Sequence, residues 1–322
     1  MTKLLLSQEI HPDARQLLGS GFETAVLDSP SPDSLRQAVS GVEGIILRTN
    51  VSVTRDIIAA APELKIISRT GAGVDNVDVA AATERGILVC NTPAANNLSV
   101  AEHTVALVLS LAKDLPAMDR AVRGGSWKLR NSGRPMELAG KTLGVIGMGR
   151  IGSSVARKCR DGFGMNIIAH DPYAASALGG EFKFSGSMEY LFTVSDFITL
   201  HCPNIPETRG MVNRALLGVM KKSAFIVNCA RGGVIDEEAL LDALKAQSIA
   251  GAALDVFAEE PPSGSGFLTL DNVILSPHSA ALTKEASVRV AVEAAQAVVD
   301  FFSGKQPDYI FNEKELKNHG CI

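Results

Sequence analysis

Aromatic residues, basic charge and long hydrophobic runs are all scarce in this 322-residue chain. Aromatic side chains make up 5% of it and the formal net charge is −4, whereas a nucleic-acid-binding face needs clustered basic residues and stacking platforms. Hydrophobic runs such as residues 105–109 are far shorter than the ~20 residues of a membrane-spanning helix. The leucines at 4–6 are too few for the hydrophobic region of a signal peptide. We therefore expect a cytoplasmic protein with neither a nucleic-acid nor a membrane partner.

Paired cysteines and metal-ligand spacings are missing as well. The 5 cysteines are scattered without a Cys-x-x-Cys pair, which suits reduced thiols, and the 6 histidines show no zinc-type spacing, so we expect no metal. What is present is an ordinary globular composition, with 46% hydrophobic and 20% charged residues. Such a composition excludes a disordered chain, and the length suggests about two domains.

Short apolar runs alternate with helix-length segments along the whole chain, which is typical of βαβ units and parallel sheets. The runs are residues 3–7, 44–48, 65–69, 142–146, 166–170, 197–201, 224–228, 249–253 and 272–276. These are too many strands for one mononucleotide-binding half. An eight-stranded barrel is the alternative, but a glycine-rich turn midway along the chain favours two doubly wound parallel sheets, an α/β fold.

Two long helical segments flank the middle of the chain. Residues 99–122 start at Ser99 and have Glu102 three residues later, which is a capping-box pattern, and residues 284–302 form the second segment. This layout predicts one discontinuous domain, residues 1–98 and 287–322, and a second domain, residues 99–286. A simple division into two consecutive halves is the alternative.

The strongest local motif is Gly147-x-Gly149-x-x-Gly152, which follows a strand-like run and precedes a helical segment. The first glycine permits a tight turn, the second lets a pyrophosphate approach the backbone, and the third permits close helix–strand packing. Asp171 ends the next strand-like run 171 − 152 = 19 residues later, close to the ~20 expected for an acid that binds the adenosine ribose. A Walker A loop would need glycine where Pro135 stands, and no Gly-x-Ser-x-Gly elbow occurs.

Asp171 also predicts the choice of coenzyme. Its carboxylate can accept hydrogen bonds from the ribose hydroxyls and repels a 2′-phosphate, and residues 172–175 contain no Arg or Lys to receive one. We expect NAD rather than NADP. The alternative is an ordinary aspartate in a surface loop.

Three polar residues follow apolar runs in the second half of the chain. They are Arg231, Glu260 and His278, and ligands of open α/β sheets bind at the carboxyl ends of strands. Taken singly, each residue also has a non-catalytic interpretation, namely a solvated arginine, a glutamate in a loop and a histidine in a Pro-His turn.

The segments that contain these residues resemble the D-2-hydroxyacid dehydrogenase family, most closely its D-3-phosphoglycerate dehydrogenases. The matching segments are residues 71–78, 91–93, 228–233, 254–261 and 276–278. The resemblance implies a Rossmann-type NAD domain inserted in a discontinuous, flavodoxin-like substrate-binding domain. It also implies a homodimer, with residues 99–122 and 117–128 in the dimer arm.

The resemblance implies a catalytic set of Arg231, Glu260 and His278. Reducing a 2-keto acid requires a proton donor near neutral pH, and the unperturbed pKa of histidine, about 6.5, suits that role. Glu260 would orient the ring and favour its imidazolium form, and the planar fork of Arg231 matches a carboxylate. Asp255 resembles the residue that holds the nicotinamide carboxamide, whereas His103 is expected to be structural.

The glycine turn and the resemblance together imply a set of cofactor-binding residues. They are Gly147, Gly149, Arg150, Ile151, Gly152, Asp171, His201, Cys202, Pro203, Thr208, Cys229, Ala230, Asp255 and His278. His201, Cys202 and Pro203 resemble the family's turn beside the adenine.

The expected substrate-binding residues are Arg48, Arg69, Gly71, Ala72, Gly73 and Arg231. Arginines at strand ends would repel one another unless an anion joined them, so we expect a 2-hydroxy acid with a second anionic group, as in 3-phosphoglycerate. If Arg48 and Arg69 pair instead with Asp75 or Asp78, a hydroxypyruvate or glyoxylate reductase of the same family is the alternative.

Two further alternatives come from relatives with the same fold. A non-enzymatic, NAD-sensing corepressor keeps a similar triad but would carry additional partner-binding extensions. A formate dehydrogenase would have Gln in place of Glu260, so this residue disfavours that activity.

Overall fold

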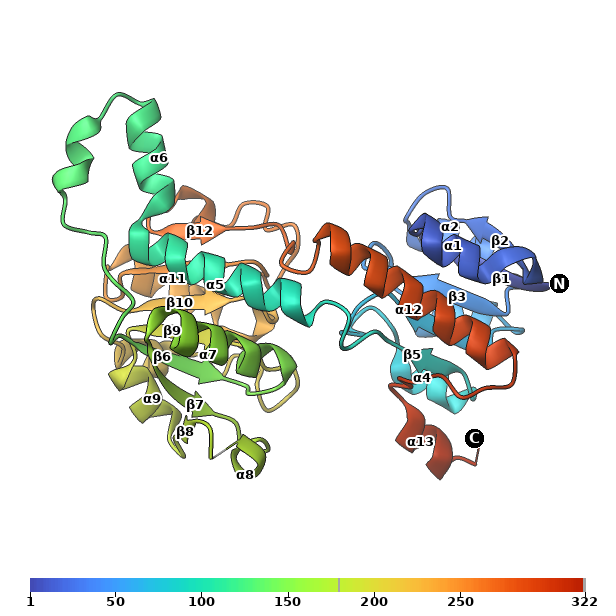
Figure 1. Ribbon diagram of the computed structural model, residues 1–322. Helices are drawn as coiled ribbons and strands as arrows, with labels where there is room; N and C mark the ends of the chain where they lie inside the picture. Colours follow the sequence, from blue (N-terminus) through green and yellow to red (C-terminus); the bar gives the residue numbers. More distant parts are fainter. Residues whose placement is uncertain (179, 321–322) are drawn as a thin grey trace. The chain divides into compact units, whose positions relative to one another are not determined.

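The computed structural model describes residues 1–178 and 180–320 and divides into two compact units. Unit 1 consists of Met1–Asn97 together with the chain from Leu282 onward, and unit 2 consists of Leu98–Ala281. Each unit contains one parallel β-sheet with helices on both faces (Figure 1). The predicted α/β class with two parallel sheets is confirmed.

The sheet of unit 1 has the strand order β2-β1-β3-β4-β5, which is that of flavodoxin-like folds. Its strands are β1 (Thr2–Leu6), β2 (Phe22–Val26), β3 (Gly44–Leu47), β4 (Ile66–Arg69) and β5 (Leu88–Cys90). Its helices are α1 (Pro12–Leu18), α2 (Pro32–Ala38), α3 (Arg55–Ala60), α4 (Val79–Glu84), α12 (Lys284–Phe302) and α13 (Glu313–Asn318), with a 3₁₀ turn η1 (Gly19–Gly21).

Alternate residues of these strands enter two separate cores, as the two-residue period of a strand requires. Leu4, Leu6 and Ile66 face α1 and α12, where Ala294 and Val298 are buried. The intervening residues face α2, α3 and α4 on the other side of the sheet. The late helix α12 therefore completes a sheet that is built from the first part of the chain.

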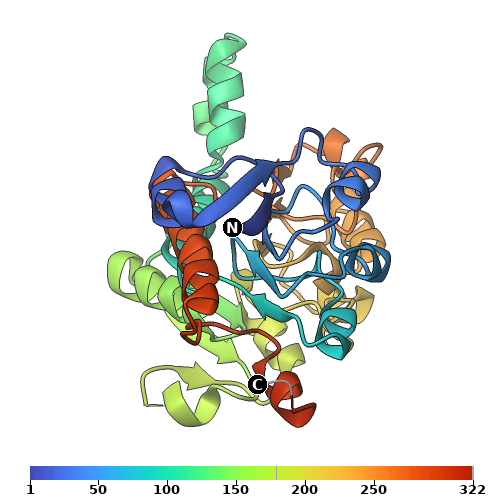
Figure 2. The ribbon, with the colours of Figure 1, turned by 90° about the vertical axis from the view of Figure 1, so that its right-hand side faces the viewer.

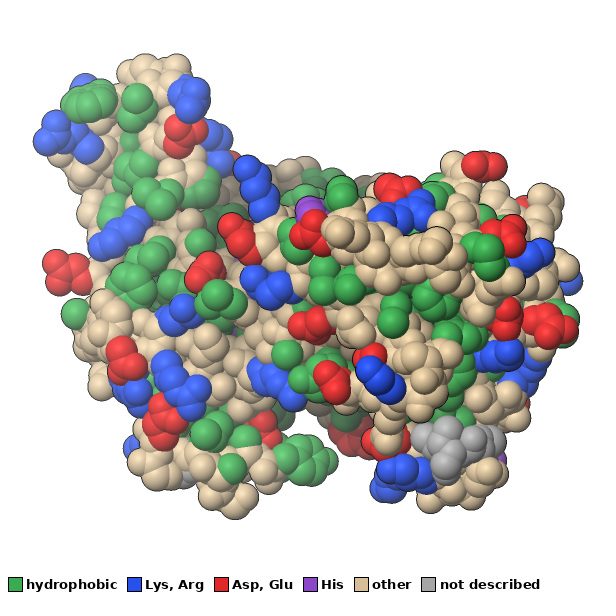
Figure 3. All heavy atoms as spheres, turned by 45° about the vertical axis from the view of Figure 1, so that its right-hand side comes forward, with side chains coloured by type: hydrophobic (Ala, Val, Ile, Leu, Met, Phe, Trp, Pro, Cys, Tyr) green, Lys and Arg blue, Asp and Glu red, His purple; other side chains and the backbone are tan. Residues whose placement is uncertain are grey.

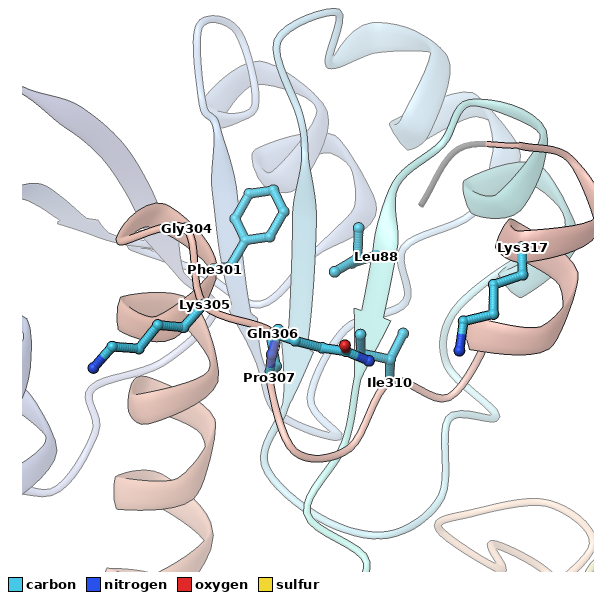
Figure 4. A pocket seen from close by; sticks show the side chains of 8 residues that line it. All are labelled: Leu88, Phe301, Gly304, Lys305, Gln306, Pro307, Ile310 and Lys317. Carbon is cyan, nitrogen blue, oxygen red and sulfur yellow. The ribbon is translucent and has the colours of Figure 1, made fainter.

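The segment after α12 covers the exposed edge of β5. The Phe311 backbone N–H donates to Val89 O at 2.7 Å, and the buried Asn312 side chain accepts from Val89 N at 2.9 Å and donates to Ile87 O at 3.0 Å. A pocket of about 320 Å³ lies beside this edge, between β5 and the end of α12 (Figure 4). Lys317, which lines it, is paired with Glu313 at 2.5 Å.

The sheet of unit 2 has the order β12-β11-β10-β9-β6-β7-β8, the arrangement of a dinucleotide-binding sheet with one added strand. Its strands are β6 (Thr142–Ile146), β7 (Asn166–His170), β8 (Lys183–Phe184), β9 (Phe197–Leu200), β10 (Phe225–Asn228), β11 (Gly251–Leu254) and β12 (Val273–Leu275). Its α-helices are α5 (Asn97–Lys113), α6 (Leu115–Arg123), α7 (Arg150–Phe163), α8 (Ala175–Leu178), α9 (Met188–Val194), α10 (Arg214–Gly218) and α11 (Glu237–Lys245). Three 3₁₀ turns complete the unit, η2 (Trp127–Asn131), η3 (Gly232–Val234) and η4 (Gly266–Thr269).

Helices cover both faces of this sheet, which explains why the sequences of its strands are continuously apolar. Val145, Phe197 and Val227 pack against α5 and α7, whereas Ile146 and Ile198 pack against α9, α10 and α11. Because the strands run parallel, the carboxyl ends of β6, β10, β11 and β12 lie on one edge of the sheet.

The predicted single helix over residues 99–122 is wrong in two respects. The chain breaks between α5 and α6 at Asp114, which adopts the left-handed conformation (φ 52°), and Pro116 then starts the new helix. The capping box at Ser99 is also wrong, because α5 already begins at Asn97 and Ser99 is buried inside it. As a result, α6 projects away from the sheet of its own unit (Figures 1 and 2).

Candidate active site

The glycine-rich turn joins β6 to α7, and its three glycines have different surroundings. A Cβ atom on Gly147 (φ +88°) would lie 2.8 Å from the backbone of His201, and one on Gly152 would lie 1.9 Å from Gly147 O. A Cβ on Gly149 would meet nothing within 4 Å. The turn is therefore closed by packing on two sides and open at Gly149, directly before the N-terminus of the 14-residue α7. This geometry fits a pyrophosphate, which the helix dipole and the free N–H groups would stabilise.

Asp171 fastens the end of β7 to this turn. Its Oδ2 accepts from Met148 N at 2.8 Å, and its Oδ1 accepts from Tyr173 N at 2.8 Å and Ala174 N at 3.0 Å. Each carboxylate oxygen can accept two hydrogen bonds, so a position on Oδ2 is still available for a ribose hydroxyl. The structure thus gives Asp171 a role in shaping the turn that the sequence did not reveal.

The segment after β9 lies against the same turn. The His201 backbone N–H donates to Ile146 O at 2.7 Å, and burial lowers the pKa of the His201 side chain to about 3. Within the described part of the chain, His201 Nε2 is buried and has no hydrogen-bond partner. The Thr208 hydroxyl closes the loop by donating to Pro203 O and accepting from Ile205 N. Burial also raises the pKa of the Cys202 thiol to about 11.

Arg231 follows β10 in a turn that is held by a buried asparagine. Asn228 Oδ1 accepts from Ala230 N at 3.0 Å, and its Nδ2 donates to Arg231 O at 2.9 Å. A Cβ on Gly232 would lie 1.9 Å from the carbonyl carbon of Phe257, so only glycine lets this turn approach the loop after β11 so closely. Asn228 and Gly232 therefore place Arg231 beside the loop that leads to Glu260.

Glu260 and His278 are in direct contact. His278 Nδ1 lies 2.7 Å from Glu260 Oε2, and Glu260 Oε1 accepts from Phe257 N at 3.1 Å. Since an ionised carboxylate only accepts, Nδ1 carries the hydrogen and Nε2 is the nitrogen left to exchange a proton. The neighbouring Glu237 accepts a hydrogen bond from Ala258 N at 2.6 Å. Burial raises the pKa of the Glu237 carboxyl group, and the negative charge of Glu260 raises it further.

Asp255 and Cys229, two of the predicted cofactor-binding residues, are buried near these side chains. Asp255 is 1% exposed, and its carboxylate accepts hydrogen bonds from the segment that contains His278. Burial raises the pKa of the Cys229 thiol to about 12, so this cysteine stays protonated and unreactive.

The predicted substrate-binding residues of unit 1 lie at the ends of β3 and β4. A Cβ on Gly71 (φ +146°) would fall 1.5 Å from Arg69 Nη1, so glycine is required for the guanidinium to lie across this loop. Asn91 Nδ2 donates to Ala72 O at 2.6 Å and steadies the loop, which continues through Gly73. Within the described residues the Arg48 guanidinium has no hydrogen-bond or ion-pair partner, and its backbone N–H donates to Ser7 Oγ at 2.8 Å.

Two residues that shape the site, Asn228 and Ser276, lie in segments that match the family but have no predicted role. Asn228 is a polar residue inside a buried strand, and that position was a usable signal because buried amides must be hydrogen-bonded. Ser276 contacts Asp255 from the neighbouring strand end, a pairing that only the tertiary structure reveals. No group of three His, Cys, Asp or Glu side chains suited to a metal occurs among residues 1–178 and 180–320.

Comparison with known sequences gives consistent matches. Residues 105–280 match the family described as D-isomer specific 2-hydroxyacid dehydrogenase, NAD binding domain. The chain is 43% identical over 316 residues to a D-3-phosphoglycerate dehydrogenase of Methanocaldococcus jannaschii, an alignment that covers 97% of this chain and 60% of the relative. It is 41% identical over 318 residues to the D-3-phosphoglycerate dehydrogenase of Homo sapiens, covering 98% of this chain and 59% of that protein. The chain thus spans about three fifths of the length of these relatives.

Solved structures with the same fold cover nearly the whole chain. The TT0316 protein of Thermus thermophilus superposes with a TM-score of 0.87 at 32% identity, covering 96% of this chain and 100% of that one. An NADPH-dependent glyoxylate/hydroxypyruvate reductase of Sinorhizobium meliloti, solved with NADP and malonate, has a TM-score of 0.86 at 29% identity, with 98% of each chain covered.

Proposed function

The chain belongs to the family of D-isomer specific 2-hydroxyacid dehydrogenases, and from this premise we propose that it interconverts a D-2-hydroxy acid and its 2-keto acid with NAD as coenzyme. The observation that carries the proposal is the 2.7 Å contact between His278 Nδ1 and Glu260 Oε2, in the same unit as the glycine turn. That contact leaves one ring nitrogen to exchange a proton with substrate.

The catalytic roles follow from these contacts. NADH, when bound, supplies the hydride for reduction of the keto carbon. His278 Nε2 donates a proton to the substrate oxygen, and Glu260 holds the ring and stabilises its imidazolium form. Arg231 binds the substrate carboxylate through its planar fork and so orients the carbonyl group. In the oxidative direction the neutral imidazole accepts the proton from the hydroxyl group.

We assign NAD binding to unit 2 and substrate binding mainly to unit 1. The family match at residues 105–280 lies within unit 2 and supports the first assignment. For coenzyme choice, Asp171 beside the open Gly149 favours the free ribose hydroxyl of NAD over the 2′-phosphate of NADP. Residues 172–175 offer no cation to such a phosphate.

The proposed substrate is a 2-hydroxy acid with a second anionic group, such as 3-phosphoglycerate. Support comes from the Arg48 guanidinium, which no described side chain neutralises, and from Arg69 at the end of the adjacent strand. Asp78 is engaged elsewhere, since it caps α4 and lies 3.8 Å from Arg55. The curated relatives quoted above are named D-3-phosphoglycerate dehydrogenases.

A hydroxypyruvate or glyoxylate reductase is the second candidate. The observation that favours it is the similarity, at 29% identity, to the structures of a glyoxylate/hydroxypyruvate reductase of Sinorhizobium meliloti and of a glyoxylate reductase of Paecilomyces thermophila. Such a substrate has no distal phosphate to neutralise the Arg48 guanidinium.

We further propose a homodimer in the cytoplasm. The helix α6 of unit 2 has no buried residue. Leu115, Val122 and Trp127, which lie in the dimer arm expected from the resemblance, are 52%, 59% and 63% exposed.

The described cysteines are all free thiols, which fits a reducing compartment such as the cytoplasm. None of the helices in the described part of the chain has the length and hydrophobicity to cross a membrane. On the face seen in Figure 3, basic and acidic side chains are interspersed rather than gathered in a basic patch.

The experiment is a panel of 2-hydroxy and 2-keto acids with and without a distal phosphate or sulfonate, assayed with NAD(H) and NADP(H). Wild type should prefer the dianionic acids and NAD(H). Arg48→Ala and Arg69→Ala should each lower kcat/KM for those acids by about 10–100-fold, because a charge-assisted hydrogen bond contributes about 1.5–3 kcal/mol. The same variants should change kcat/KM little for unsubstituted acids.

Arg55→Ala is the matched control, since Arg55 lies in the same unit and pairs with Glu84 at 2.6 Å. A wild-type preference for unsubstituted acids would favour the reductase instead. Failure to turn over any acid, with NADH still bound, would favour the non-enzymatic corepressor.

A further inference from the structure

The segment that contains His278 is tied to one buried carboxylate. Asp255 Oδ1 accepts from the Ser276 hydroxyl at 2.5 Å and from Ser279 N at 2.9 Å, and Oδ2 accepts from Ala280 N at 3.0 Å. The His278 backbone N–H donates to the backbone carbonyl of Asp255 at 2.8 Å. Residues 276–280 therefore take their conformation from Asp255.

This attachment offsets a strained backbone. His278 has φ +51°, in the left-handed region, which costs a residue with a Cβ atom about 1–2 kcal/mol. The hydrogen bonds that Ser276, Ser279 and Ala280 donate to Asp255 maintain that conformation. They thereby keep the imidazole oriented toward Glu260. If the segment relaxed, the 2.7 Å contact between the two side chains would be lost.

A second histidine completes the network from α5. His103 Nε2 lies 3.1 Å from Ser276 Oγ and 3.7 Å from Asp255 Oδ1. A serine hydroxyl has a single hydrogen, and in Ser276 that hydrogen points at Asp255. Ser276 Oγ must therefore accept from His103, so His103 Nε2 carries a hydrogen. The donors run in one direction, from His103 to Ser276 to Asp255.

We propose that His103 is a positioning residue for the dehydrogenase reaction. Through Ser276, His103 fixes the orientation of the Asp255 carboxylate. In that orientation the carboxylate holds the segment that contains His278, and a lone-pair position on Oδ2 is left for the carboxamide of the nicotinamide. His103 itself touches neither substrate nor coenzyme. The proposal rests on the function proposed above and adds a residue whose only catalytic contribution is made through Ser276 and Asp255.

The test compares two replacements of similar size. His103→Gln keeps an N–H donor at about the same reach and should retain kcat and the KM for NADH within about threefold. His103→Leu has no donor and should lower kcat about 10-fold and raise the KM for NADH, since small misplacements at a reacting centre cost that much or more. The KM for the keto acid should stay near wild type, and the thermal midpoint should be equal in both variants.

Ser276→Ala supplies a double-mutant cycle. If His103 acts only through Ser276, the double variant with His103→Leu should lose no more activity than Ser276→Ala alone. Equal losses in His103→Gln and His103→Leu, full activity of His103→Leu, or additive losses with Ser276→Ala would each overturn the proposal.

A binding measurement separates this proposal from the proposed function. Fluorescence titration compares NADH with its reduced 3-acetylpyridine analogue, which lacks the carboxamide N–H₂ group. His103→Leu should weaken NADH several-fold and leave the analogue unchanged, while His103→Gln should affect neither. A wild-type protein that binds NADH but reduces no 2-keto acid contradicts the proposed function alone, and the titration then decides the role of His103. Equal weakening of both nucleotides contradicts the positioning role.

Discussion

Burial removes one histidine and three cysteines of unit 2 from acid–base chemistry near neutral pH. It lowers the pKa of His201 to about 3, so this imidazole stays neutral, and it raises the pKa of the Cys159 and Cys229 thiols to about 12. His278 is different because its Nδ1 meets an ionised carboxylate. Its protonation should therefore control how the reaction depends on pH.

Glu260→Gln tests that control. Reduction of a keto acid needs the imidazolium form of His278, which the negative charge of Glu260 stabilises. The amide keeps an acceptor oxygen but removes the charge, so the alkaline limb of the kcat/KM profile should move to lower pH. The measurement is kcat/KM for keto-acid reduction between pH 5 and 10.

Glu259→Gln is the control, since it removes the same charge one residue away, on a side chain that is exposed. Its profile should coincide with that of wild type. An unmoved profile in Glu260→Gln, or an equal displacement in both variants, would contradict a specific pairing of Glu260 with His278.

At the scale of residues, the sequence shows which side chains follow apolar runs but not which distant side chains they contact after folding. The positions of Arg231, Glu260 and His278 at strand ends are visible in the sequence, since apolar runs end there. The contacts of His103 with Ser276 and of Asn228 with the turn at Arg231 join residues that periodicity cannot relate. The helical pattern around His103 predicts packing, and its contact with Ser276 lies outside that helix.

At the scale of elements, the apolar runs located most strands within one or two residues, because a strand covered on both faces has to be continuously hydrophobic. The strands β2, β5 and β8 were missed. Strand β2 lies at a sheet edge with no buried residue, whereas β5 and β8 span only 3 and 2 residues. The break between α5 and α6 was missed because the apolar pattern continues through Asp114, where the backbone turns left-handed.

Two glycines of the turn differ in their surroundings, and alanine variants can test what each one does: Gly149 faces open space, whereas Gly152 packs against Gly147 O. Gly149→Ala places its Cβ in open space and should leave thermal stability near wild type, but it should weaken NADH at least 10-fold because the methyl group occupies the place of the pyrophosphate. Gly152→Ala collides with Gly147 O and should cost about 1–3 kcal/mol of folding free energy.

Thermal unfolding and NADH titration of the two variants separate these effects. If Gly149→Ala bound NADH as tightly as wild type, the pyrophosphate could not be bound at this turn. Wild-type stability of Gly152→Ala would mean that α7 can move away from β6 without cost.

At the scale of the whole molecule, the order of helices and strands was sufficient to predict two parallel sheets, because βαβ units permit few other layouts. The family resemblance, not the residue pattern, predicted a dimer arm. Of the residues that the resemblance places in the arm, 99–113 belong to α5 and pack into the core, whereas α6 and η2, which we call the arm from here on, carry exposed apolar side chains (Figure 3).

Val122→Asp tests whether the arm joins two copies of the chain. A charge in the centre of an apolar interface is strongly unfavourable, so sedimentation velocity at about 10 μM should change from dimer for wild type to monomer for the variant. Thermal stability of the isolated fold should change little, since Val122 is 59% exposed.

Tyr190→Ser is the control, because Tyr190 is an exposed apolar residue of unit 2 outside the arm, at 50% exposure. It should leave the dimer intact. A monomeric wild type, or a dimer that survives Val122→Asp, would refute the role of the arm.

The way unit 1 is assembled from both ends of the chain also has a consequence for its biosynthesis. As the nascent chain leaves the ribosome, strands β1 to β5 are made first, but α12 and the segment with Asn312 follow only after all of unit 2. At ~5–20 residues per second, that interval is roughly 10–40 s. Throughout it, the face with Leu4, Leu6 and Ile66 lacks α12 and has only α1 against it, and β5 is an open edge. Unit 2, whose residues are consecutive, can therefore fold as it is synthesised, whereas unit 1 cannot be completed until its last helices have been made.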